Sequence, residues 1–202
     1  MTIEELPTII DQGENAKVDF KRQWYKKEDL KGEFVKDMLA LANGDIHSID
    51  KTAYLIIGIE DETKKAFKFD DTDIPRSLDK LTQQLLEILN NNSQPEFLSL
   101  DIKWIDYQGE EILVLSVEPH GRLISLSKDL KLKKTTDKKG TVYYRIGENI
   151  RVASADLIKD FEKAFNKNLS SGGTTINIQG DVNGIAHVSG GKVEQTLNFT
   201  KS

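Results

Sequence analysis

The stretches GENAKVDFKRQ (residues 13–23), ALAN (40–43) and AYLIIGIED (53–61) decide the fold. In the first stretch, residues 17–21 alternate polar and apolar side chains as a half-buried strand does, with Lys17, Asp19 and Lys21 on the polar face. Residues 29–43 carry apolar side chains at helical spacing and end at Asn43-Gly44, a typical helix stop. The apolar run at 54–59 suits a central strand buried on both faces. The pattern therefore predicts a strand, a helix and a central strand in succession.

The rest of the main domain is predicted from the same kinds of signal. The elements expected are a helix at 3–11 with Thr2 as its cap, a helix from the Ser77 cap to Asn90, strands at 97–106 and 111–118 joined by a turn at 107–110, a strand at 141–145 and a helix at 154–166. This order of elements predicts an α+β domain over residues 1–168, with a mixed β-sheet flanked by helices.

The last segment differs in composition. Residues 169–175 form a Ser/Gly/Thr linker, and residues 176–202 alternate apolar and polar side chains between Gly-containing turns. Such a short β-rich tail cannot bury a core alone. We expect it to pair with copies of itself or with a partner protein, making a homo-oligomer of two or more chains. The alternative is a disordered tail.

Composition limits the function classes. The chain of 202 residues has no cysteine, which excludes disulfides and thiolate sites and favours a reducing cytoplasm. No charged-then-apolar leader opens the chain, and no apolar run approaches the roughly 20 residues of a membrane span, so no membrane is expected. The net charge of −5 counts against a dedicated nucleic-acid coat.

Local charge favours nucleic acid more than the total does. Lysines crowd the first motif and a later polar run at 128–139, although a solvated face would explain either cluster. The candidate contacts to a nucleic-acid backbone are Lys17, Arg22, Lys131, Lys133, Lys134, Arg145 and Arg151.

Three carboxylates form the candidate chemical site. Glu14 lies in the turn before the first strand, Asp19 lies on that strand and Asp61 follows the central strand. If they meet, they offer the hard oxygen ligands that Mg²⁺ or Mn²⁺ prefers. Lys21, on the same face as Asp19, would donate to a phosphate oxygen. Glu60 remains an alternative to Asp61, and a surface ion pair with an ordinary turn acid would explain the same residues without a metal.

The sequence resembles a known family. ENAKVDFKRQ, ALAN, YLIIGIED, VEPHG and YYRIGENIRVAS are similar to the core of the Schlafen family and its bacterial relatives, the divergent Alba-like nucleic-acid-binding domains. The resemblance covers roughly residues 10–165. In that family, three carboxylates bind the metal with which the enzyme cuts structured RNA such as transfer RNA. The resemblance implies that these carboxylates are Glu14, Asp19 and Asp61 here, and that Lys21 faces the phosphate.

The chain also departs from that pattern. Thr52-Ala53 stands where the family often has a Gly-Gly pair, and the second acid is Asp19 rather than a glutamate. The zinc-binding cysteines, the helicase and the second core lobe of animal Schlafens are missing, so a two-lobed cradle would require dimerisation.

Two functional hypotheses follow. The first is a metal-dependent RNase, acting as a bacterial defence or toxin effector. The second is a non-catalytic nucleic-acid-binding or scaffold protein that oligomerises through its tail.

Overall fold

The fold was analysed in a computed structural model that describes residues 5–97 and 99–171. A four-stranded mixed sheet runs in the order β1-β2-β5-β4, with β1 parallel to β2 and the other pairs antiparallel. Its strands are β1 (Val18–Lys21), β2 (Ala53–Ile57), β4 (Asp101–Tyr107) and β5 (Glu110–Val117). The predicted α+β class is therefore confirmed.

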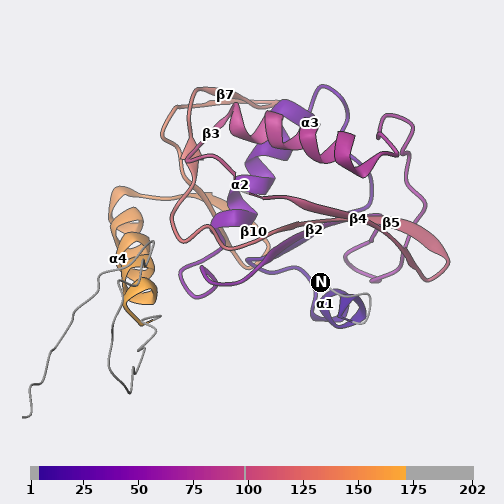
Figure 1. Ribbon diagram of the computed structural model, residues 1–202, viewed down its shortest axis with the longest axis horizontal. Helices are drawn as coiled ribbons and strands as arrows, with labels where there is room; N and C mark the ends of the chain where they lie inside the picture. Colours follow the sequence, from indigo (N-terminus) through magenta and orange to yellow (C-terminus); the bar gives the residue numbers. More distant parts are fainter. Residues whose placement is uncertain (1–4, 98, 172–202) are drawn as a thin grey trace, which may run out of the picture. The chain divides into compact units, whose positions relative to one another are not determined.

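Helices cover both faces of this sheet (Figure 1). α2 (Val35–Asn43) and α3 (Leu78–Asn90) pack on the face that contains Leu55 and Ile57, whereas α1 (Leu6–Gln12) packs on the face that contains Ile56. Neighbouring residues of β2 thus enter different cores, as the continuous apolar run predicts.

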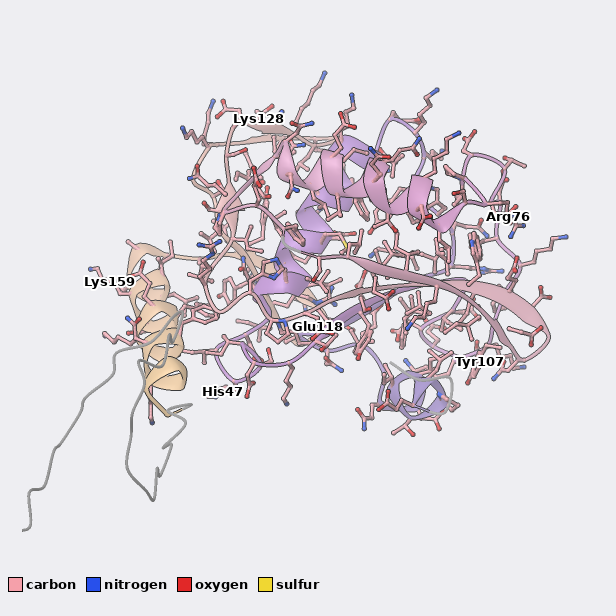
Figure 2. All side chains as sticks on the ribbon, in the orientation of Figure 1. His47, Arg76, Tyr107, Glu118, Lys128 and Lys159 are labelled. Atoms are coloured by element: carbon pink, nitrogen blue, oxygen red, sulfur yellow. The ribbon has the colours of Figure 1, made fainter. Side chains whose placement is uncertain are left out.

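Two local signals in the sequence are confirmed. Ser77 caps α3, because its hydroxyl accepts a hydrogen bond from Lys80 N at 3.4 Å. Gln108 and Gly109 both have positive φ in the turn between β4 and β5, as a two-residue hairpin turn requires. Figure 2 shows Arg76 and Lys128 at opposite ends of α3.

The β1 strand differs from its prediction. Lys17 and Asp19 are each 4% exposed, so they are as buried as Val18 and Phe20, and the expected exposed polar face is wrong. The reason is tertiary: α2 covers that face, and strand alternation alone does not show whether a polar face meets water or other charged groups.

The helix predicted at 29–43 begins as a π-helical segment, η1 (Leu30–Phe34), and continues as α2. Short π segments of this kind are frequent at functional sites. The lysine-rich run contains a small hairpin, β7 (Leu130–Lys131) and β8 (Thr136–Asp137), and two further residue pairs form β3 (Ser93–Gln94) and β6 (Ser125–Leu126).

The chain ends, where described, in a second hairpin and a helix. β9 (Tyr143–Ile146) pairs with β10 (Asn149–Val152), a strand that sequence patterning missed, and α4 (Ala155–Ser171) follows. α4 runs past the predicted end at Asn166 and into the expected linker. The predicted tail at 176–202 lies outside the described residues, as does the Thr2 cap. Within the described ranges, no helix is both long and apolar enough to cross a membrane.

Candidate carboxylate site and adjoining cleft

β1 brings two charged side chains to the face covered by α2. Lys21 Nζ lies 2.7 Å from Asp19 Oδ2 and 3.4 Å from Asp37 Oδ2 on α2. Arg145 of β9, which is 1% exposed, donates from Nη1 to Asp19 Oδ1 at 2.8 Å. We call these four residues the buried charge network. Two carboxylates face two cations in it, which is how proteins tolerate charge away from water.

The network shifts the pKa values of Lys21 and Asp37. Burial lowers the pKa of Lys21, but the charges of Asp37 and Asp19 outweigh burial and raise the pKa overall. Burial raises the pKa of Asp37, against the opposing charge of Lys21 and the hydrogen bond that Tyr25 donates at 2.7 Å. Lys21 therefore remains a cation at neutral pH.

A second group of acidic side chains lies nearby and has an excess of negative charge. Glu14, Asp61 and Glu148 each offer one carboxylate oxygen, and these oxygens all lie within 4.8 Å of one another. We call them the carboxylate cluster. Each comes from a different part of the fold: the turn before β1, the turn after β2 and the tip of the β9–β10 hairpin. In the described part of the chain, one cation forms an ion pair with the cluster: Lys64 pairs with Asp61.

Glu14 is held in place by the backbone. Its Oε1 accepts a hydrogen bond from Phe20 N at 2.7 Å. Burial is the largest influence on this carboxyl and raises its pKa; the Phe20 hydrogen bond opposes the rise, and the negative charges of Asp19 and Asp61 add to it. A bound cation would offset the repulsion between Glu14 and these negative charges.

The donor set of the cluster fits a hard divalent ion. Oxygen ligands about 2.1 Å from one Mg²⁺ lie within about 4.2 Å of each other, which is close to the spacing here. Carboxylates are also the ligand type that Mg²⁺ and Mn²⁺ favour. A small contraction would bring Glu14, Asp61 and Glu148 to coordinating distance.

The predicted triad and the observed cluster overlap in two members. The structure brings Glu14 and Asp61 together, and it leaves Glu60 outside, paired with Arg22 at 3.1 Å. Asp19 lies close enough to affect Glu14 but is occupied by Arg145 and Lys21. Sequence reasoning missed Glu148, because its only local signal is the Gly-Glu tip of a hairpin, and nothing in the sequence shows which strand that tip approaches.

The basic side chains predicted to contact nucleic acid lie in different environments. Lys17 and Arg145 are buried, and Lys17 Nζ donates to Ala42 O at 2.7 Å, so neither presents its charge at the surface. Arg22 is exposed but pairs with Glu60 and lies over the Phe67 ring. The exposed members of the set are Lys131, Lys133 and Lys134 around the β7–β8 hairpin and Arg151 on β10.

A cleft of about 580 Å³ opens beside the buried charge network. Residues 21–37, which connect β1 to α2, form one wall, and residues 132–135 form the other. Lys21 and Asp37 belong to both the network and the cleft lining. The cleft therefore adjoins the buried charge network through these two side chains.

The Schlafen AlbA_2 family model matches residues 14–154, well over half of the chain. The chain belongs to the Schlafen AlbA_2 family. Membership in this family indicates a nucleic-acid-related domain. The matched range contains β1, the carboxylate cluster and both walls of the cleft.

Two solved structures are similar to this Schlafen AlbA_2 domain at low sequence identity. The DIP2311 protein of Corynebacterium diphtheriae is 16% identical with a TM-score of 0.50 over 80% of this chain, and this chain spans only 28% of that one. The N-terminal domain of a RecG-related protein from Nitrosomonas europaea is 17% identical with a TM-score of 0.38, over 73% of this chain and 92% of that domain. No curated protein sequence matches the chain.

Proposed function

We propose that this Schlafen AlbA_2 domain is a metal-dependent nuclease that acts on RNA. The observation that carries the proposal is the carboxylate cluster, in which Glu14, Asp61 and Glu148 lie within 4.8 Å of one another with one lysine beside them. An excess of negative charge at one point is unfavourable for the folded chain unless a cation offsets it. Family membership adds that the cation would be used on nucleic acid.

The roles of the chain's own residues follow from their contacts. Glu14, Asp61 and Glu148 would hold Mg²⁺ or Mn²⁺, which supplies Lewis acidity and a more acidic water at a phosphodiester. Lys21 would donate to a phosphate oxygen, and Asp19 and Asp37 keep it charged and fixed in position. Asp19 and Arg145 are positioning residues, because they hold Lys21 and the β9–β10 hairpin against β1.

The experiment compares wild type with Glu14→Gln, Asp61→Asn and Glu148→Gln. Each protein is incubated with transfer RNA, single-stranded DNA and duplex DNA in Mn²⁺, with EDTA as the metal-free condition. We expect wild type to cut RNA, and each substitution to lower the rate at least 100-fold, about the loss that follows when metal or oxyanion stabilisation is removed. Glu62→Gln is the matched control, since this exposed acid is next to Asp61 but outside the cluster.

Cleavage that persists in all three variants would rule out the cluster as the catalytic centre.

A second function is favoured by one contact, the ion pair between Lys64 and Asp61, which already places a cation at the cluster. In this alternative the domain binds nucleic acid without cutting it. Binding by wild type without cleavage on any of the three substrates would establish that alternative.

A further inference from the structure

The cleft beside β1 has a lining that suits an anionic ligand. Five lysines line it against three carboxylates, which leaves two positive charges in excess: Lys21, Lys26, Lys36, Lys133 and Lys134 against Asp29, Glu33 and Asp37. The chain as a whole has the opposite sign, with a net charge of −5. The cleft is therefore a local basic region on an acidic protein.

The excess charge belongs to two particular lysines. Three of the five are paired: Lys133 lies 2.8 Å from Asp29, Lys36 pairs with Glu33, and Lys21 joins the buried charge network. Lys26 and Lys134 are exposed, and neither forms an ion pair within residues 5–97 and 99–171. Their ammonium groups are available to phosphate oxygens.

One wall of the cleft is aromatic. Trp24 and Tyr25 line it, both partly buried, with their ring centroids 5.7 Å apart in an edge-to-face arrangement. Phe34 supports both rings from the core, at 6.1 Å from Trp24 and 5.4 Å from Tyr25. Because both rings are packed on a buried phenylalanine, they form a firm surface rather than mobile side chains.

The opposite wall is held by specific contacts. A Cβ atom at Gly32 would lie 2.6 Å from Lys131 O, so only glycine lets the β7 strand approach η1 this closely. β7 packs against η1, the segment that directly precedes α2 in the chain. The Lys133 backbone N–H also donates to Glu33 Oε1 at 3.4 Å. The width of the cleft is therefore fixed by the fold.

We propose that this cleft receives one unpaired nucleotide of a single-stranded nucleic acid, with the base against Trp24 and the flanking phosphates at Lys26 and Lys134. The volume of about 580 Å³ suits a ligand of nucleotide size, since pockets for small ligands span about 300–1,000 Å³. A base inside a duplex presents only its edges, whereas an unpaired base can use an aromatic wall. Lys21, which would contact a phosphate in the proposed function, also lines this subsite. The inference therefore rests on the proposed function and adds that its substrate is single-stranded.

Tryptophan fluorescence tests the proposal, because the chain has only two tryptophans. Trp104 lies away from the cleft, stacked on Phe69 with ring centroids 5.9 Å apart. Trp104→Phe leaves Trp24 as the only emitter, and Trp24→Phe leaves Trp104. A ten-nucleotide oligouridylate is titrated into each protein. EDTA and a Glu14→Gln background keep the RNA from being cut, so the titration measures binding alone.

We expect oligouridylate to quench the Trp24 emission and to leave the Trp104 emission unchanged. Trp24→Leu should weaken binding about 5- to 100-fold, the usual effect of removing one stacking platform. Lys26→Gln with Lys134→Gln should weaken binding and reduce its dependence on salt, whereas Lys51→Gln, an exposed lysine between α2 and β2, should do neither. The double lysine variant keeps the test valid if Trp24→Leu fails to fold.

Three results would overturn the proposal. Oligouridylate that binds by fluorescence anisotropy without quenching Trp24 would show that no base enters the cleft. Duplex RNA that quenches Trp24 at equal concentration would rule out the single-strand requirement, and uridine monophosphate that binds as tightly as the oligomer would assign the cleft to a free nucleotide. None of these readouts depends on cleavage, so a failed nuclease test and a failed cleft test are distinguishable.

Discussion

The carboxylates on and around β1 fall into two regions, one in which cations balance the negative charge and one with an excess of negative charge. Asp19 is 4% exposed and contacts both Arg145 and Lys21, so its charge is compensated inside the protein. Glu14, Asp61 and Glu148 are more accessible, and within residues 5–97 and 99–171 the cation paired with them is Lys64. Removing one member of a balanced buried network leaves a buried charge without its partner, whereas an excess of one charge is what a bound ion or substrate can use. The comparison separates residues that build the site from residues that act in it.

The largest expected effect is the removal of one partner from the buried charge network. Arg145→Met leaves Asp19 buried without its guanidinium partner, and breaking a buried pair in this way costs about 3–5 kcal/mol of unfolding free energy. Urea denaturation measures the loss. Adding Asp19→Asn to Arg145→Met should recover part of it, because the uncompensated charge is then gone.

The control for this prediction is a second arginine. Arg22→Met removes a partner of Glu60 at the surface, where an ion pair contributes at most about 1 kcal/mol. Equal losses for the Arg145 and Arg22 variants would show that the buried network does not hold β9 to β1.

Lys17 extends the comparison, because it is a buried charge that forms no ion pair with any carboxylate of the described residues. Its Nζ donates to Ala42 O near the end of α2, and burial lowers its pKa to about 8, against smaller opposing effects of Asp45 and Asp50. The ordinary pKa of a lysine is 10.5. Between about pH 8 and 10.5, Lys17 therefore binds more protons in the unfolded chain than in the folded chain. Charging Lys17 costs the folded state roughly 3 kcal/mol below pH 8, and this cost disappears as the pH rises.

We expect the stability of wild type to increase relative to Lys17→Met between about pH 8 and 10.5, by up to roughly 3 kcal/mol. Urea denaturation of both proteins across this range isolates Lys17, because every other titrating group is shared. A constant difference between the two proteins would contradict the lowered pKa.

The same comparison shows how far sequence alone reaches. Ser77, the turn at 107–110 and the apolar run of β2 were predictable because each signal is local and has one structural meaning. The burial of Asp19 was not, since its partner Arg145 is 126 residues away and strand alternation cannot distinguish a solvated face from a charged interior. Glu148 was missed for the same reason: packing of the β9–β10 hairpin on α2 and the ion pair between Arg145 and Asp19 decide its position.

The smallest expected effect concerns the carboxylate cluster itself. Glu148→Gln removes one of three like charges, so without metal we expect unfolding free energy to rise or stay level, by no more than about 1 kcal/mol. Mg²⁺ or Mn²⁺ should then raise the melting temperature of wild type and of Glu62→Gln, but not of Glu148→Gln, because ligands stabilise only the state that binds them. A loss of several kcal/mol for Glu148→Gln, similar to that of Arg145→Met, would place Glu148 among the structural charges. Since the two substitutions lie three residues apart on one hairpin, opposite outcomes would assign the building role and the acting role to individual side chains rather than to the hairpin as a whole.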